Sequence, residues 1–132
     1  MKYFFLITCL FAVMLASVLQ SCSKPAVDAV SIVIGTPTEG QTVDANKTIA
    51  IKASINAQNQ IHGYTMTLRN KTTNQTLLTK ETGMRHAKNF EINETWTNNV
   101  GQTTDVELEL VVYLNHSFSE TKKQTLTFKC LK

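Results

Sequence analysis

The sequence has little net charge and none of the short motifs that carry enzymatic or nucleotide chemistry. It holds 13 Lys and Arg against 10 Asp and Glu over 132 residues, and the basic residues are scattered. A basic stripe with interleaved aromatic residues, typical of nucleic-acid binding, is absent from the sequence. So are a glycine-rich phosphate loop and a serine or threonine nucleophile motif. We therefore expect no nucleic-acid partner and no enzymatic activity.

Long hydrophobic runs are also scarce, and the single one lies at the start of the chain. Lys2 precedes an apolar stretch, residues 3–19, whose polar members are Thr8 and Ser17. A basic start followed by an apolar stretch and small residues predicts a secretory signal peptide. The alternative is a retained membrane helix, although such a span usually needs about 20 apolar residues.

The residues at the end of this run resemble the lipobox of bacterial lipoproteins. In Leu19-Gln20-Ser21-Cys22, a small residue precedes a cysteine. The resemblance implies that residues 1–21 are a removed signal peptide and that Cys22 carries a diacylglycerol and an acylated amine. More than one acyl chain gives stable attachment to a lipid membrane. Residues 22–28 are then the lipidated cysteine and a tether.

The residues after Cys22 indicate the side of the membrane on which the protein is anchored. Ser23-Lys24-Pro25 begins no acidic run. Lipoproteins exported to the surface of some Gram-negative cells carry an acidic tag at this place. We therefore expect a lipid-anchored protein of the Gram-negative cell envelope, on the periplasmic side of the outer membrane.

Cysteine is rare, and its positions exclude an internal disulfide in the mature chain. Of the three cysteines, Cys9 lies in the signal peptide and Cys22 is the lipidation site, which leaves Cys130. Cys130 shares the apolar face of its strand with Leu126 and Phe128, so we expect a buried thiol that acts as a small hydrophobic group. An intermolecular disulfide and a reactive thiol are the alternatives.

Helical spacing of apolar residues is absent after the signal peptide, where apolar and polar residues alternate with a period of two. In residues 105–114, for example, Val106, Leu108 and Leu110 are separated by glutamates. This pattern predicts an all-β domain over residues 29–132. We expect seven strands, near residues 29–34, 47–56, 63–69, 76–82, 89–96, 105–114 and 121–130.

Seven short strands with regular turns over about 100 residues are typical of a Greek-key sandwich. The segment Ile34-Gly35-Thr36-Pro37-Thr38-Glu39-Gly40-Gln41-Thr42-Val43 resembles the first turn of bacterial immunoglobulin-like and fibronectin-III-like domains. In those domains a Pro-x-x-Gly turn links the first two strands. The mature chain is similar to small bacterial lipoproteins with a single seven-stranded immunoglobulin-like sandwich. This resemblance implies a fold and a location, and no reaction.

The three histidines fall in connections that the expected topology brings to one end of the sandwich. Successive connections alternate between the two ends, so the second, fourth and sixth share an end. These connections contain His62, His86 and His116, and Met84 lies beside His86. Imidazole suits zinc and copper, and a thioether favours Cu(I). The four residues are candidate ligands of a copper or zinc ion; unrelated surface histidines are the alternative.

Trp96 is the single tryptophan of the chain and has two interpretations. Its ring could stack a sugar as a platform for a glycan or another partner. Alternatively it packs in the core with Phe90 and Ile92, where a tryptophan buries a large apolar area.

A pair of carboxylates on one strand also has two interpretations. Glu107 and Glu109 lie two residues apart, so they point to the same face. Such a pair could serve glycoside hydrolysis. If Leu110 instead faces Leu126 across a hairpin, Glu107 pairs with Lys129 on a solvated surface, where the pair stabilises little.

Two functions follow from these observations. The first is a membrane-anchored, non-catalytic binding or structural module of the cell envelope, whose partner is another envelope protein or a glycan. The second is a periplasmic transition-metal-binding protein that holds Cu or Zn through its loop histidines. Histidines more than about 10 Å apart would exclude a single-ion site, because metal–nitrogen bonds are near 2 Å.

Overall fold

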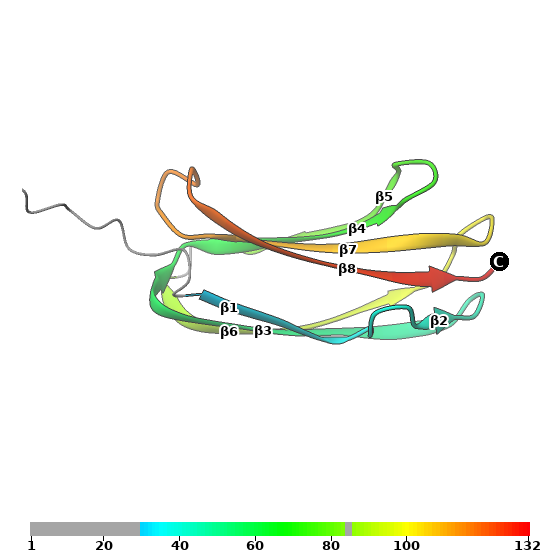
Figure 1. Ribbon diagram of the computed structural model, residues 1–132, viewed down its shortest axis with the longest axis horizontal. Coiled ribbons are helices and arrows are strands. Elements are labelled where there is room, and N and C mark those ends of the chain that lie inside the picture. The colour runs from blue at the N-terminus through cyan, green and yellow to red at the C-terminus, as the bar shows by residue number, and fades with distance from the viewer. Residues whose placement is uncertain (1–29, 84–85) are drawn as a thin grey trace, which may run out of the picture.

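The computed structural model describes residues 30–83 and 86–132, which form two β-sheets packed face to face (Figure 1). The expected signal peptide, the lipidation site Cys22, the tether and the candidate ligand Met84 lie outside the described residues. Within the two described ranges, no helix is long and apolar enough to cross a bilayer.

Both sheets are built from short strands that the alternating pattern favours. The first sheet has the order β1-β3-β6, with β1 (Val30–Thr36), β3 (Thr48–Ile61) and β6 (Ala87–Thr97). The second has the order β2-β8-β7-β4-β5. Its strands are β2 (Thr42–Val43), β4 (Gly63–Asn70), β5 (Thr76–Glu81), β7 (Thr104–Tyr113) and β8 (Thr121–Cys130). The prediction of an all-β sandwich with two sheets is confirmed.

The predicted count of seven strands is wrong, because the described residues contain eight. The additional strand is β2, which has two residues and pairs in parallel with β8. Thr42 lies opposite Lys129, and Val43 lies opposite Cys130. Two residues are too few to show a period of two, so the alternation could not reveal this strand.

The core fills the space between the sheets with the inward residues of each strand. In β7, Val106, Leu108, Leu110 and Val112 are buried and alternate with more exposed residues. This regular alternation places one face of the strand against the opposite sheet. The core is therefore continuous from one sheet to the other, and the ends of the strands project their connections at the two ends of the sandwich (Figure 1).

Cys130 belongs to this core. It is free and fully buried at the end of β8. Burial raises the pKa of its thiol to about 11. The thiolate is the reactive form of cysteine, so a thiol with this pKa stays protonated and unreactive near neutral pH. Cys130 thus packs as the small hydrophobic residue that its position on the strand predicts.

Candidate metal centre

Three connections meet at one end of the sandwich, and each carries a histidine. They join β3 to β4, β5 to β6 and β7 to β8, and they lie at the end where the chain enters β1 (Figure 1). His62, His86 and His116 occupy these connections in that order. The antiparallel course of the strands therefore gathers all three histidines at the same end.

His62 is the single residue between β3 and β4, where the chain passes from one sheet to the other. Its backbone N–H donates to the carbonyl oxygen of Tyr113, at 2.8 Å, which ties it to the end of β7. The next residue, Gly63, has a φ of +138°. This backbone region strongly favours glycine, so Gly63 makes the abrupt change of sheet possible.

Alanine at Gly63 is expected to lower the free energy of unfolding by about 1–3 kcal/mol, as for other strained backbone positions. A Cβ at Gly63 would lie 2.9 Å from the carbonyl oxygen of Thr82, so backbone would have to move. Urea denaturation measures the loss. Gly101→Ala is the matched control, because no heavy atom lies within 4 Å of its added Cβ. Equal stability of the two variants would contradict the role given to Gly63.

His86 is placed beside His62 by the pairing of β3 with β6. After an irregularity between Asn56 and Ile61, the register resumes with Ile61 opposite Ala87. His62 follows the first of these paired residues, and His86 precedes the second. In an antiparallel pair these two positions extend past the end of the ladder side by side, which brings the two imidazoles together.

His116 lies in a loop that Asn115 holds in a fixed shape. The side-chain oxygen of Asn115 accepts hydrogen bonds from the backbone N–H groups of Ser119 and Glu120, at 3.0 and 3.3 Å. Its amide nitrogen donates to Ser119 Oγ at 2.8 Å. Leu114 N–H donates to the Glu120 carbonyl at 2.8 Å and closes the loop. Asparagine side chains commonly organise turns in this way, so the backbone of the loop that carries His116 is held in place before any ligand arrives.

The three imidazoles have the spacing of a mononuclear metal site. One ring nitrogen from each histidine can be chosen so that all three lie within 4.8 Å of one another. The Nδ1 atoms of His62 and His116 are 3.3 Å apart. Metal–nitrogen bonds of about 2.0–2.1 Å at tetrahedral angles place ligand nitrogens about 3.3 Å apart. One pair of nitrogens is thus already at the ligand spacing, and no pair in the set of three is more than about 1.5 Å beyond it.

The ring arrangement agrees with this spacing. The centroid of the His62 ring lies 5.1 Å from that of His86 and 5.2 Å from that of His116. The His86 and His116 rings are nearly parallel, with centroids 5.8 Å apart. Three imidazoles pointing at one tetrahedral ion would have centroids roughly 5.2 Å apart. The three rings therefore lie at about the spacing of the ligands of one ion, and the nearly parallel rings of His86 and His116 have to rotate for both lone pairs to point at it.

The surroundings of His62 favour its neutral imidazole. His62 is half-buried, whereas His86 and His116 are exposed. Burial lowers the pKa of His62, and the neighbouring His86 and His116 lower it further. A neutral imidazole keeps a lone pair for a metal ion. His62 can therefore bind a cation near neutral pH without first releasing a proton.

Trp96 lies in the core rather than on the surface. Only 7 % of it is exposed, and its ring packs edge-on against Phe128 with centroids 6.3 Å apart. Its faces are covered, so it cannot stack a sugar. The glycan-platform interpretation of Trp96 is corrected to its alternative, core packing.

The two glutamates of β7, Glu107 and Glu109, have other partners on β8 than the pairing of Leu110 with Leu126 would give them. Leu108, rather than Leu110, lies opposite Leu126, so Glu107 faces Thr127. Glu109 contacts Lys123 at 2.9 Å. This ion pair on the outer face of the sheet accounts for Glu109 without a catalytic role.

Comparisons with known proteins add a likeness to one kind of module. No family model and no curated protein matches the chain. Among solved structures, the fibronectin(III)-like modules of Clostridium thermocellum CbhA are similar to it. The sequence identity is 16%, the TM-score is 0.48, and the match covers 76% of this chain and 96% of that one.

Proposed function

We propose that this chain is a lipid-anchored, non-catalytic module of the bacterial cell envelope that binds one copper or zinc ion through His62, His86 and His116. The observation that carries the proposal is the convergence of three imidazoles whose ring nitrogens lie within 4.8 Å of one another. Three connections far apart in sequence supply them, so their convergence follows from the fold rather than from a local motif.

The donor set explains the choice of metal. Imidazole suits zinc and copper, whereas calcium and magnesium take oxygen ligands. Three protein nitrogens leave at least one coordination position open for water or another ligand. A site of this kind suits capture and transfer of an ion. Acylation of Cys22, as the lipobox resemblance implies, would hold this end of the sandwich near the membrane, because the chain enters β1 there (Figure 1).

The hydrogen bond between His62 and His116 defines the first step of binding. The two Nδ1 atoms are 3.3 Å apart, so one ring donates its Nδ1–H and the other accepts. Both atoms can ligate an ion only when both carry lone pairs. The donating ring therefore moves its proton to Nε2, which imidazole tautomerism allows. The spacing of the two atoms needs no change on binding.

Isothermal titration of Cu(I), Cu(II) and Zn(II) into the full chain in detergent micelles tests the proposal. The chain is purified without a histidine tag, because such a tag would supply its own imidazoles. We expect one ion per chain for at least one of these metals. We expect no binding in the triple variant His62→Ala, His86→Ala, His116→Ala, since no histidine remains in it.

Two further comparisons complete this experiment. Gln102→Ala, at an exposed position in the connection that follows β6, serves as the control and should bind as the natural chain does. Circular dichroism of the triple variant must show an intact fold. Undiminished binding in a folded triple variant, or no binding of any of the three ions to the natural chain, would overturn the proposal.

A further inference from the structure

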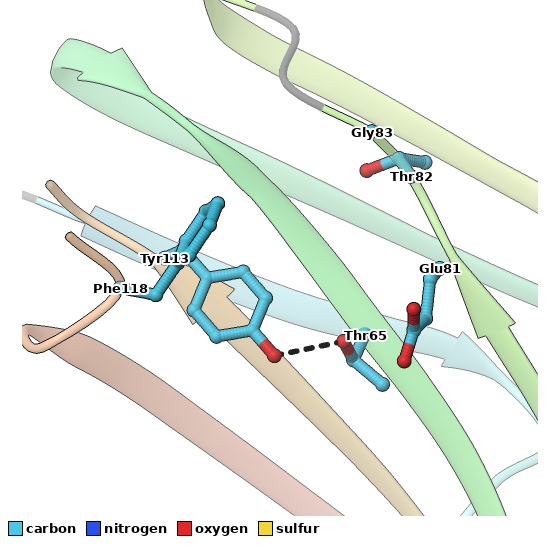
Figure 2. A pocket seen from close by; sticks show the side chains of 6 residues that line it. All are labelled: Thr65, Glu81, Thr82, Gly83, Tyr113 and Phe118. Carbon is cyan, nitrogen blue, oxygen red and sulfur yellow. Dashed lines mark hydrogen bonds between the residues drawn. The ribbon is translucent and has the colours of Figure 1, made fainter. Parts of the chain in front are cut away.

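A second candidate site lies on the outer face of the five-stranded sheet, and neither the histidines nor the core residues line it. A cavity of about 430 Å³ crosses β4 between the end of β7 and the end of β5. Its lining residues are Thr65, Glu81, Thr82, Gly83, Tyr113 and Phe118 (Figure 2). This volume falls within the range of small-molecule pockets.

One wall of the pocket is aromatic. The rings of Tyr113 and Phe118 meet with centroids 4.8 Å apart and planes inclined at 67° (Figure 2). Phe118 is 44% exposed and is one of two exposed large hydrophobic residues in the described chain. Its φ is +56°, a left-handed conformation that a bulky side chain rarely adopts. The loop closed by Asn115 thus holds an aromatic ring in a costly conformation at the mouth of a cavity, as binding sites often do.

The rest of the pocket is polar and offers both donors and acceptors. Thr65 Oγ1 and Tyr113 Oη share one hydrogen bond of 2.9 Å (Figure 2), so one of the two hydroxyl protons is left for a ligand. Thr82 Oγ1 accepts from the Tyr64 N–H at 3.1 Å and keeps its own proton to donate. Glu81 is exposed and takes part in neither ion pair of the described residues, which join Lys80 to Glu94 and Lys123 to Glu109. Its carboxylate can therefore accept hydrogen bonds from a ligand.

This combination selects among ligand chemistries. A saccharide has C–H faces that pack on aromatic rings and hydroxyl groups that both donate and accept, so it can use every group in the pocket. An ammonium ion has no acceptor for the hydroxyl donors. An anion would meet the carboxylate of Glu81. The lining therefore matches a neutral saccharide better than either kind of charged ligand.

We propose that this pocket binds a neutral saccharide, with Phe118 and Tyr113 packing on the sugar ring and Glu81 accepting from its hydroxyl groups. No histidine lines this pocket, so saccharide binding there does not need a bound metal ion, although Phe118 lies in the same loop as His116. It assigns the glycan-binding role to Phe118 and Tyr113 in place of the buried Trp96.

Nuclear magnetic resonance of the ¹⁵N-labelled full chain in micelles of a sugar-free detergent tests this proposal. The probes are chitotriose, cellotriose and maltotriose, each titrated separately. For at least one of them we expect saturable shifts centred on the amides of Thr65, Glu81, Thr82, Tyr113 and Phe118. The same shifts are expected in the triple histidine variant, which distinguishes this site from the metal centre.

Two variants probe the two walls of the pocket. Phe118→Ala and Glu81→Gln should each weaken binding of the active trisaccharide about tenfold or more, the range for losing a packed ring or a hydrogen bond to a charged group. Their matched controls are Val33→Ala and Glu91→Gln, exposed residues on the three-stranded sheet, which should leave the affinity unchanged.

Three results would overturn the saccharide assignment. The first is the absence of shifts with all three trisaccharides at 10 mM. The second is an equal weakening in the control variants. The third is a response of these amides to butylammonium chloride without any response to sugar, which would make the pocket a cation site. Glu81→Gln keeps the shape of the side chain. It therefore still tests the role of the carboxylate in saccharide binding if Phe118→Ala disturbs the loop.

Discussion

Zinc at a thousand times its dissociation constant is expected to raise the free energy of unfolding of the chain by about 4 kcal/mol. The reason is that the three histidines converge only in the folded chain, where separate connections bring their nitrogens within 4.8 Å. For a domain of about 100 residues, this corresponds to a rise in melting temperature of roughly 15–30 °C. Thermal unfolding of the full chain in micelles, followed by circular dichroism with and without zinc, measures it.

The zinc-dependent rise should disappear as the pH falls from 7.5 to 5. The pKa of His62 in the folded chain is lowered from its ordinary value of 6.5, first by burial and then by the two other histidines. The unfolded chain therefore takes up a proton at higher pH than the folded chain does. The stability that neutral His62 contributes is complete above about pH 6.5 and is lost as the pH falls through the lower folded value. The zinc-dependent rise itself falls because protons compete with zinc for all three imidazoles, and the loss in stability of the metal-free chain adds to this in the total stability.

Single substitutions distinguish zinc binding at the three histidines from weak zinc binding at side chains elsewhere on the chain. His62→Ala removes the ring that lies nearest to both others and should abolish nearly the whole zinc-dependent rise in melting temperature. His62→Gln keeps a polar side chain of similar length and should behave like alanine, because an amide is a poor zinc ligand. A rise of the same size in the natural chain and in His62→Ala would show that zinc binds elsewhere.

The gathering of the histidines could be predicted from sequence because it depends only on direction. Each strand carries the chain from one end of the sandwich to the other, so counting strands places His62, His86 and His116 at the same end. The additional strand β2 does not disturb this count, because it lies within the first connection. The distances could not be predicted, because they depend on the register of Ile61 opposite Ala87 and on the loop held by Asn115.

Register is the quantity that alternation leaves undetermined. The pairing of Leu126 with Leu110, on which one interpretation of the glutamates depends, is wrong, because Leu126 lies opposite Leu108. A shift of two residues keeps every side chain on the same face of the sheet, so the hydrophobic pattern is equally satisfied by both pairings. The loop between β7 and β8 decides between them, and with it which charged residues meet.

The pocket that we propose binds a saccharide could not be predicted from sequence for a related reason. Tyr113 ends a regular strand, whereas Phe118 lies in a loop where no periodicity applies. Their contact depends on the left-handed conformation of Phe118, which is costly for phenylalanine and which its residue type does not predict. The signal that was available is Asn115 followed four residues later by Ser119, a pattern that can form a closed turn through side-chain hydrogen bonds.

Asn98 is the residue whose importance the sequence hid most completely, because two consecutive asparagines favour an exposed turn. The structure buries Asn98 to 1% exposure at the end of the sandwich opposite the histidines. Its amide nitrogen lies 3.1, 3.0 and 2.8 Å from the carbonyl oxygens of Val43, Asp44 and Leu131. One side chain thus joins the end of β6 to β2 and to the residue after β8.

Asn98→Asp is expected to lower the free energy of unfolding by about 3–5 kcal/mol at pH 7, the range for an uncompensated buried charge. Aspartate has the same shape but brings a carboxylate against three carbonyl oxygens that now lack their donor. This is a large share of the stability of a domain of this size, about 5–15 kcal/mol. Urea denaturation measures the loss, and Asn99→Asp, the same change at the exposed neighbouring residue, should stay within about 0.5 kcal/mol of the natural chain.

The stability of Asn98→Asp should also depend on pH. Burial against carbonyl oxygens should raise the pKa of the new carboxyl group in the folded chain, because only the protonated form can donate to them. The deficit in stability relative to the natural chain should then shrink as the pH falls through that raised value towards about 4, the ordinary pKa of aspartate. A deficit that is equal in Asn98→Asp and Asn99→Asp, or that does not change with pH, would contradict the role assigned to the Asn98 amide. Because the histidines lie at the other end of the sandwich, zinc affinity of the folded variant should remain that of the natural chain.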